Sequence, residues 1–429
     1  MALRRGRAAV LVAGGGIAAL CAAIAARRAG AAVTLLDAAP PDLRGGNTRH
    51  SRNLRLCHDA PSPLFPDRYP AADFAADLAT AAGAGGDPAL AALLVERSAE
   101  LPVWLAGQGV VFQTRAQGGL PWSRKTAFFL GGGRAMINSL YRTALGLGVR
   151  IHHQCAVTAL DPGGGVWLAG PGGPARLSAG AVVVASGGYQ ANPSRLAEGW
   201  GDLAGRLVVR GTPYADGAPL AALFGLGAAA SGQPGAGHLV AVDGRLAAPD
   251  GGIVTRVDGL ALGLVVDAAG RRPVEETSIT GPTRYARWGQ VVAACPGATA
   301  WAVWDAAARG RLPPAVLSPE TAPSLDALGH ALAIPAGTLG RAMGECGRVA
   351  TPPFFYVPIR PGITFTSHGV RVDRQARVVD AAGRPLDALF AAGMVMAPSL
   401  LGTGYLAGAA LTIAAVFGRI AGEQAARQG

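Results

Sequence analysis

The chain has 429 residues, more than one hydrophobic core usually organises, so we expect two domains or one large domain with a sizeable insertion. Half of the residues are hydrophobic and 15% are charged, with 63 glycines and 31 prolines, which excludes a largely disordered chain and suits an α/β enzyme. The net charge of +11 comes from scattered basic residues, which favours an anionic ligand and no nucleic-acid partner. The five cysteines form no C-x-x-C pair, which predicts no metal site and favours a reducing cytoplasm.

A β-α-β unit opens the chain, with predicted elements at 8–12 (strand), 14–16 (turn), 17–28 (helix) and 32–36 (strand). The G-x-G-x-x-A pattern from Gly14 places bare backbone N–H groups and a helix dipole where they can hold a pyrophosphate. Asp37 ends the second strand, where its carboxylate can accept hydrogen bonds from ribose hydroxyls. The alternatives are a glycine-rich turn beside a surface aspartate, and a secretory signal, whose apolar run the glycines would interrupt.

The middle of the chain predicts more elements of the same sheet and then changes character. Apolar periodicity predicts amphipathic helices at 88–107 and 133–146, a hairpin or loop at 163–173, and a buried strand at 181–185 that stops at Ser186. From about Ser231 the pattern consists of short β-like runs and loops, which we interpret as an inserted domain. Near Phe365 a hairpin-like pattern leads to an apolar strand at 388–392.

An uncharged segment covers residues 390–418 and contains a G-x-x-x-G pattern from Gly404 to Gly408, so a transmembrane helix must be considered. Pro398 and five glycines interrupt this segment. They favour a buried turn followed by a helix.

Several spaced blocks resemble a known family: 45–48 (Gly-Gly-Asn-Thr), 182–188, 389–393 and 404–408. On these blocks the chain resembles, over nearly its whole length, the flavoprotein subunits of the succinate dehydrogenase and fumarate reductase family. Five further blocks are most similar to tricarballylate dehydrogenases and to the flavin domain of an aerobic corrin-synthesis protein. They are 46–53, 127–133, 210–214, 284–289 and 360–366.

The resemblance implies an α/β fold in which a Rossmann-like FAD-binding domain carries an inserted α+β capping domain. The FAD-binding domain would comprise residues 1–235 and 365–429, and the capping domain residues 236–364.

FAD is the implied cofactor. The resemblance places its pyrophosphate at Gly14 and Gly16, its ribose at Asp37, and its flavin ring near 46–52 and 404–406. The remaining implied contacts are Gly45, Gly46, Asn47, Thr48, His50, Ser51, Arg52, Val157, Ser186, Gly187, Gly188, Gly393, Met394, Gly404, Tyr405 and Leu406. His50 aligns with a histidine that some relatives bond covalently to flavin, but Arg49 and Arg52 distinguish this loop, so we expect non-covalent attachment.

The resemblance also implies a catalytic arginine and a set of carboxylate ligands. Arg284 is the candidate for the arginine that handles the substrate proton, with a helix-surface arginine as the alternative. His238 is the candidate for binding a substrate carboxylate, with a loop histidine as the alternative. The implied substrate wall is completed by Arg360, Thr364, Thr366 and Tyr405.

Three departures from the fumarate reductase pattern bear on the substrate. Thr364 stands where those enzymes have a second histidine, Tyr405 where they have an arginine, and Met394 where a glutamate usually contacts the ribityl chain. Succinate or fumarate is therefore disfavoured as the substrate.

The leading hypothesis is a dehydrogenase that oxidises a tricarballylate-like polycarboxylate and passes electrons to a separate carrier, membrane-bound or not. This predicts a cytoplasmic chain, or one held at the inner membrane through that partner. Two alternatives stay open: an oxygen-using flavin enzyme of corrin (precorrin-3B) synthesis, and a catalytically inactive flavin-binding protein, which Met394 motivates.

Overall fold

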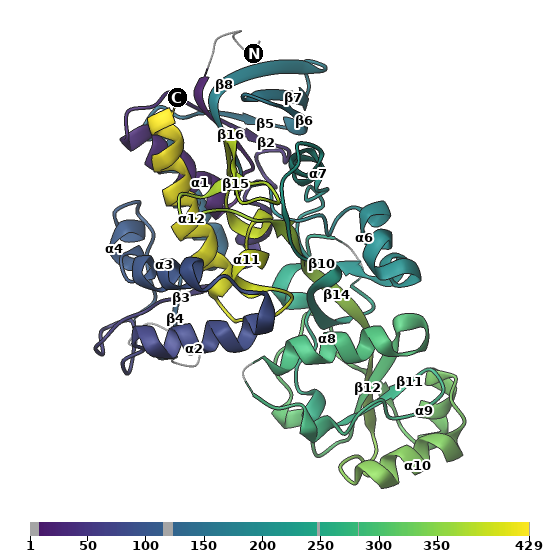
Figure 1. Ribbon diagram of the computed structural model, residues 1–429. Coiled ribbons are helices and arrows are strands. Elements are labelled where there is room, and N and C mark those ends of the chain that lie inside the picture. The colour runs from purple at the N-terminus through teal and green to yellow at the C-terminus, as the bar shows by residue number, and fades with distance from the viewer. Residues whose placement is uncertain (1–7, 115–122, 247–248, 282, 429) are drawn as a thin grey trace. The chain divides into compact units, whose positions relative to one another are not determined.

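A computed structural model describes residues 8–114, 123–246, 249–281 and 283–428 (Figure 1). The chain forms two compact units. The first comprises Met1–Asn192, Tyr214–Gly237 and Phe365–Gly429, and the second comprises Pro193–Pro213 and His238–Thr364. The sequence-based boundaries assign residues 193–213 to the first domain. The structure assigns them to the second unit, because strand β9 (Val208–Val209) pairs with β14 (Phe354–Val370) there.

The first unit is built on an eight-stranded sheet whose main path runs β15-β16-β8-β1-β2-β5. All neighbours on this path are parallel except β15 and β16. The strands are β1 (Ala8–Ala13), β2 (Val33–Asp37), β5 (Arg150–His153), β8 (Ala175–Val184), β15 (Arg377–Val379) and β16 (Pro385–Ala391). Continuous apolar runs such as Val182–Val184 suit strands that are buried on both faces. The predicted α/β fold is confirmed.

An antiparallel extension joins β8 through β6 (Ala156–Asp161) and β7 (Gly165–Ala169). The glycine-rich stretch 163–173, predicted as a hairpin or a loop, therefore forms strand β7 and the two turns beside it. The hairpin is the correct alternative. Gly164 has φ +88°, and a Cβ there would collide with the carbonyl oxygen of Ala179, so this turn requires glycine.

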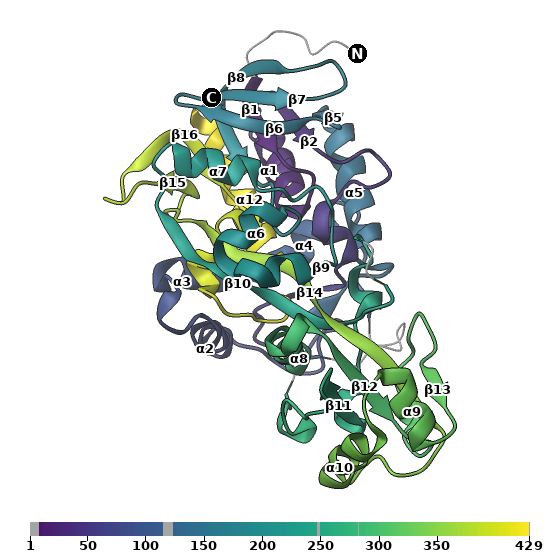
Figure 2. The same ribbon diagram turned by 90° about the vertical axis from the view of Figure 1, so that its right-hand side faces the viewer.

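Two long helices from opposite ends of the sequence pack against each other, α1 (Ile17–Arg28) and α12 (Ala409–Gln428), as Figure 2 shows. Cβ atoms at Gly418 and Gly422 would collide with the backbone of Ala18 and Ala22. The uncharged segment thus ends in a helix packed within the first unit, after the short helix α11 (Pro398–Leu401). None of the helices in the described ranges has both the length and the hydropathy that a membrane crossing requires.

The remaining helices of the first unit include α2 (Ala71–Ala82), α5 (Gly132–Gly146) and α7 (Ala218–Gly225). The single helix predicted at 88–107 is wrong, because α3 (Pro88–Ser98) and α4 (Leu101–Ala106) replace it. Pro102 explains the break, since proline lacks a backbone N–H and fits only the first turn of a helix. A small sheet pairs β3 (Asn53–Arg55) with β4 (Thr126–Phe128).

The second unit packs helices on both faces of a sheet. Its sheet has the order β10 (Ala230–Asp243), β14, β12 (Ala300–Trp304) and β11 (Leu264–Asp267). Strands β9 and β13 (Glu320–Ala322) also pair with β14. Alternate residues of β11 (Leu264–Asp267) and β12 (Ala300–Trp304) face two separate cores. One core includes Trp288 of α8 (Arg284–Ala294). The other includes residues of α9 (Leu325–Leu332) and α10 (Ala336–Cys346). The unit also contains β13 (Glu320–Ala322) and α6 (Pro193–Trp200).

Two long strands differ from the predicted short runs. β10 (Ala230–Asp243) has 14 residues and β14 (Phe354–Val370) has 17. Phe365 lies inside β14, and the hairpin is formed later by β15 and β16. Glycine and proline lower the strand propensity of 232–237, but pairing with a neighbouring strand overrides local propensity.

Candidate functional site

The expected cofactor residues meet at one edge of the parallel sheet. The register aligns Ala13 of β1 with Leu36 of β2 and with Val184 of β8, and Val184 with Ala391 of β16. These strands therefore end together, and the segments that follow them share one edge. They begin at Gly14, Asp37, Ser186 and Gly393, which span nearly four hundred positions of the sequence. This edge is where open α/β sheets bind ligands.

The turn at 14–16 requires its glycines for different reasons. Gly14 has φ +131°, and a Cβ there would collide with the carbonyl oxygen of Ala185. A Cβ at Gly15 would collide with the Asp37 carboxylate, whereas one at Gly16 would lie 3.2 Å from Thr48 Oγ1. Gly15, which the G-x-G pattern leaves unspecified, is thus constrained by the side chain of Asp37, whereas Gly14 is constrained by main chain and by its own φ. Gly16 provides no side-chain cap to α1, and the first turn of α1 has no acidic residue, so its positive dipole end suits an anion.

Asp37 is held in place by groups that the sequence does not indicate. Its side chain accepts the Ala39 N–H at 3.1 Å, and the hydroxyl of Tyr141 lies 2.9 Å from Oδ2. Burial, reinforced by Asp37, raises the pKa of Tyr141, which keeps this hydroxyl a donor. Nδ1 of His153 lies 3.5 Å from Oδ2. A carboxylate has about four lone-pair sites, so these contacts leave capacity for ribose hydroxyls.

Val157 is brought to the same end of β2. The N–H of Cys155 donates to the Asp37 carbonyl at 3.0 Å, which sets the start of β6 beside Asp37. Val157 itself is buried and pairs with Leu168 of β7.

The loop 45–52 is built against the turn at 14–16. Gly45 has φ +105°, and residues Gly46–His50, which include Asn47 and the half-buried His50, form a 3-10 turn. Thr48 Oγ1 accepts the N–H of Ile17 at 3.2 Å, which links this turn to the first residue of α1. Ser51 Oγ donates to the Thr48 carbonyl at 2.6 Å.

The glycines before α5 support this loop from the other side. The N–H of Gly133 donates to the Ser51 carbonyl at 2.7 Å, and a Cβ at Gly133 would collide with the Thr48 carbonyl. Arg52 places its guanidinium carbon 5.9 Å from the ring centre of Phe128. Packing thus explains Gly133, whereas Gly131 and Gly132 have positive φ.

The turn after β8 contains a buried polar atom that lacks a partner. Ser186 Oγ is buried and has no hydrogen-bond partner within the described residues, and Gly187 next to it has φ +81°. Since an orphaned buried hydroxyl is costly, a bound cofactor would satisfy it. A Cβ at Gly188 would collide with Thr366 Oγ1. Thr366 is fully buried and accepts the Tyr189 N–H at 3.3 Å, a contact that supports a packing role for this residue.

The C-terminal block reaches the same region of the first unit. Gly393 has φ +72°, and a Cβ there would lie 2.9 Å from Cβ of Ala18 in α1. Met394 follows it in a short 3-10 turn and is half-buried. Gly404 packs against the carbonyl of Ala81 at the end of α2, so its lack of a side chain has a packing reason too.

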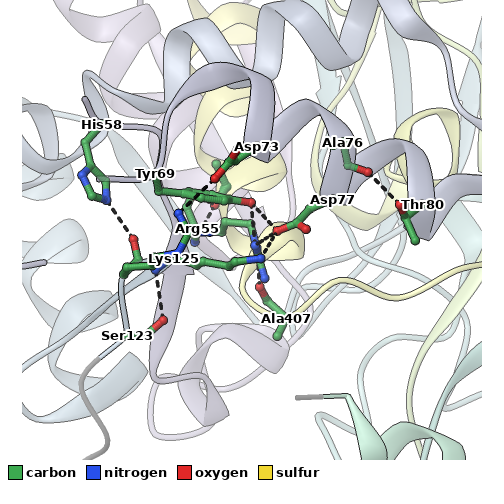
Figure 3. A network of polar contacts seen from close by, with 12 residues as sticks. Arg55, His58, Tyr69, Asp73, Ala76, Asp77, Thr80, Ser123, Lys125 and Ala407 are labelled. Carbon is green, nitrogen blue, oxygen red and sulfur yellow. Dashed lines mark hydrogen bonds and ion pairs between the residues drawn. The ribbon is translucent and has the colours of Figure 1, made fainter. Parts of the chain in front are cut away.

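A partly buried polar network contacts the loop that contains Tyr405 and Leu406. Arg55 Nε donates to the Ala407 carbonyl at 3.0 Å, and Nη1 lies 2.7 Å from Asp77 Oδ2 (Figure 3). Lys125 Nζ lies 2.7 Å from the same oxygen, and the Tyr69 hydroxyl lies 2.6 Å from it. The Tyr405 ring lies 6.3 Å from the ring of Phe365, and Leu406 is buried. This network anchors the backbone of the loop at Ala407.

Within the second unit, the structure brings two of the expected substrate residues into one polar cluster. His238 is 6% exposed and makes an edge contact with the Tyr285 ring at 6.0 Å. Arg256 lies over the same ring at 4.6 Å, and Arg210 Nη1 donates to Thr364 Oγ1 at 2.8 Å. Burial lowers the pKa of His238 well below its ordinary value, and the charges of Arg210 and Arg256 lower it further.

The two arginines that the sequence predicts for the substrate site lie outside this cluster of contacts. Arg284 is the first residue of α8 and exposed, and its Nη1 lies 3.3 Å from the Gly281 carbonyl oxygen. The next residue along α8 is Tyr285, whose ring contacts His238. Arg360 is half-buried and donates to the Arg206 carbonyl at 3.0 Å.

The depressed pKa of His238 predicts a pH dependence of stability. Since the unfolded chain binds this proton below about pH 6.5 and the folded chain resists it, stability is lost as the pH falls below that value. We expect His238→Gln to reduce this acid destabilisation by roughly 1 kcal/mol near pH 5.5. Urea unfolding of both proteins at pH 7.5 and 5.5 measures the change in the free energy of unfolding between the two pH values. An equal loss of stability in both proteins would contradict the buried, neutral state of His238.

The comparison with protein families gives one match that covers most of the chain. The family described as "FAD binding domain" matches residues 9–411. Two curated relatives match over short stretches. "Probable fumarate reductase Ifc3" of Shewanella frigidimarina is 43% identical over 75 residues, which is 18% of this chain and 13% of that protein. "Urocanate reductase" of Eggerthella lenta is 35% identical over 74 residues, which is 17% of this chain and 12% of that protein.

Solved structures share the fold over nearly the whole chain. A flavocytochrome c3 fumarate reductase has a TM-score of 0.79 at 23% identity, covering 98% of this chain and 78% of that chain. The 3-ketosteroid delta1-dehydrogenase of Sterolibacterium denitrificans has a TM-score of 0.81 at 16% identity, covering 99% of this chain and 100% of that chain. Enzymes with different named substrates thus share this fold, so the fold does not select a substrate.

Proposed function

The chain belongs to the FAD binding domain family, and from this premise we propose that it is an FAD-dependent oxidoreductase that dehydrogenates a tricarballylate-like polycarboxylate. The observation that supports FAD most directly is the shared sheet edge, where Gly14, Asp37 and the orphaned hydroxyl of Ser186 follow aligned strand ends. FAD, when bound, supplies the capacity to accept a hydride from carbon.

The residues of this chain would bind the acid and handle its proton. We assign carboxylate binding to His238, Thr364 and Arg360, and proton transfer to Arg284. A neutral His238 can donate one hydrogen bond to a carboxylate. Arg284 fits its role because it is exposed at the start of α8, next to the residue that contacts His238. Thr366 is the least supported of the expected substrate residues, since its hydroxyl is fully buried.

We propose that FAD is bound without a covalent bond to His50. His50 lies in a tight 3-10 turn between Arg49 and Arg52, both absent from the covalent pattern. Acid precipitation of the yellow protein should release the flavin into the supernatant. Yellow colour retained on the washed pellet would show a covalent link.

We further propose that electrons leave to a separate carrier, which would place the chain in the cytoplasm or at the inner membrane. Two proteins of known structure that share this fold are quinol fumarate reductases, one of them with bound menaquinol. Reduction of a soluble dye by substrate-reduced protein, with slow reoxidation by air, is the expected result. Fast reoxidation by air would instead favour the oxygen-using corrin enzyme.

The decisive experiment is anaerobic mixing of the FAD-loaded protein with a panel of organic acids. We expect tricarballylate-like acids to bleach the flavin absorbance and succinate to have little effect. The reason is that Thr364 and Tyr405 stand where fumarate reductases have a histidine and an arginine that bind the smaller dicarboxylate. A protein that retains FAD and is bleached by no acid of the panel would contradict the proposal. That result would favour the inactive flavin-binding alternative.

A further inference from the structure

The segment after strand β8 contains a second buried polar atom that lacks a partner. Gln190 is 2% exposed, and its Oε1 atom has no hydrogen-bond partner among the residues that the structure describes. It lies four residues after Ser186, whose hydroxyl also lacks one there. A buried amide oxygen without a donor costs free energy, so a ligand that donates a hydrogen bond to it would be stabilised.

The glycine before Gln190 shows where this oxygen lies. A Cβ at Gly188 would be 3.0 Å from Gln190 Oε1 and would collide with Thr366 Oγ1. The side chain of Gln190 therefore turns back toward the turn that begins at Ser186. This turn follows strand β8, whose end is aligned with the ends of β1 and β16. The oxygen thus belongs to the same sheet edge as the cofactor residues.

The backbone around Gln190 is held by hydrogen bonds within the first unit. The Ala191 N–H donates to the Ala215 carbonyl at 3.0 Å. The Asn192 N–H donates to the Tyr189 carbonyl at 3.0 Å, which closes a turn around Gln190. These bonds keep Gln190 at its buried position.

The chemistry of the oxygen selects the kind of ligand. An amide oxygen accepts hydrogen bonds and donates none. The carboxylates of an ionised organic acid are also acceptors only, so they do not suit this oxygen. FAD has the donors that it needs, in the hydroxyls of its ribose and ribityl chain, the amino group of its adenine and a ring N–H of its flavin. The oxygen therefore fits the cofactor better than the acid.

We propose that Gln190 is an FAD-binding residue whose side-chain oxygen accepts a hydrogen bond from a hydroxyl or N–H group of the cofactor. The proposal rests on FAD as the cofactor of the family and is independent of which acid the protein oxidises. It adds a residue to which the sequence assigned no role.

The test compares the FAD-loaded wild-type protein with Gln190→Met, which keeps the length of the side chain and removes its hydrogen-bonding groups. Release of FAD after dilution is measured by the recovery of flavin fluorescence. We expect release to be roughly 10-fold faster, because the donor of FAD loses its acceptor and most changes in affinity appear in the dissociation rate.

Urea unfolding separates this role from a purely structural one. A ligand stabilises the folded protein according to the ratio of its free concentration to its dissociation constant. Raising free FAD about 10-fold should therefore return the urea midpoint of Gln190→Met at least to the wild-type value. A midpoint that stays below the wild-type value would overturn the proposal, since it would show that the amide already has a partner inside the protein.

Gln108→Met is the matched control, because Gln108 is also buried but is paired at both ends of its amide. It is 3% exposed, its Oε1 accepts from Arg28 at 2.8 Å, and its Nε2 donates to the Trp104 carbonyl at 2.7 Å. Arg28 is the last residue of α1, whose first turn follows Gly16. Gln108→Met should lower the urea midpoint at each FAD concentration and leave the rate of FAD release unchanged.

Two further results would overturn the proposal. One is release of FAD from Gln190→Met at the wild-type rate. The other is a Gln190→Met protein that is purified without colour and is not loaded by FAD at about 10-fold higher concentration, since the substitution removes one hydrogen bond only. The proposed dehydrogenation fails separately, because it is contradicted when no acid bleaches the wild-type flavin.

Discussion

Replacing Gly14 with alanine should yield colourless protein that cannot be reconstituted with FAD. Gly14 has φ +131°, which alanine rarely adopts, and its Cβ would collide with the Ala185 carbonyl, which is main chain in the adjacent turn. A shift of the turn would break the hydrogen bond that the N–H of Gly14 donates to the Leu36 carbonyl at 2.8 Å, so relieving the collision costs free energy. We expect more than about 3 kcal/mol of strain at this site. The ratio of visible flavin absorbance to protein absorbance measures the outcome.

Two glycines of the same unit provide matched controls. Gly146, in α5, has an ordinary φ and open space around its Cβ position, so Gly146→Ala should keep full flavin content. Gly16→Ala should reduce FAD affinity less than Gly14→Ala, since the nearest protein atom to its Cβ would be Thr48 Oγ1 at 3.2 Å, and Gly16 has no positive φ. Gly14→Ala protein with a normal flavin content would disprove the placement of the cofactor at this turn.

Arg284→Lys should retain FAD but lower the rate of acid-dependent dye reduction roughly 100-fold or more, the usual size of a lost proton-transfer group. Lysine keeps the positive charge but loses the planar fork that fixes both the carboxylate and the proton. Arg284→Ala should be slower still. His238→Ala should instead mainly raise KM, because a group that holds a remote carboxylate acts similarly in the ground state and the transition state.

Arg287→Lys is the control for this experiment, because Arg287 lies one turn along α8 and is also exposed. It should turn over at the wild-type rate. If Arg284→Lys also matches wild type with an active substrate, the assignment of Arg284 is wrong and another group handles the proton.

Local sequence patterns were sufficient for the β-α-β unit that opens the chain. The apolar runs and the Gly14 turn predict β1, α1 and β2 within a residue of their observed bounds, because a buried parallel strand and a helix dipole site each need only short-range features. The break at Pro102 was equally local, and was missed only because the flanking apolar pattern continues through it.

Tertiary structure alone decided which residues support these motifs. Tyr141 contacts Asp37 from a helix about a hundred positions away, and nothing in its own neighbourhood distinguishes it from other apolar-face residues of α5. Gly15 is constrained only because the Asp37 carboxylate occupies the space where its Cβ would be.

Local sequence patterns also could not predict to which of the two units residues 193–213 belong. The sequence places this segment with the cofactor domain, but pairing of the two-residue strand β9 with β14 attaches it to the second unit and sets Arg210 against Thr364. The sequence by itself determined the opening strands, the first helix and the glycine turn, since strand and helix periodicity and backbone sterics act over a few residues. The partners of each functional side chain depended on strand pairing between distant segments, which only the folded chain decides because register is a property of two strands together.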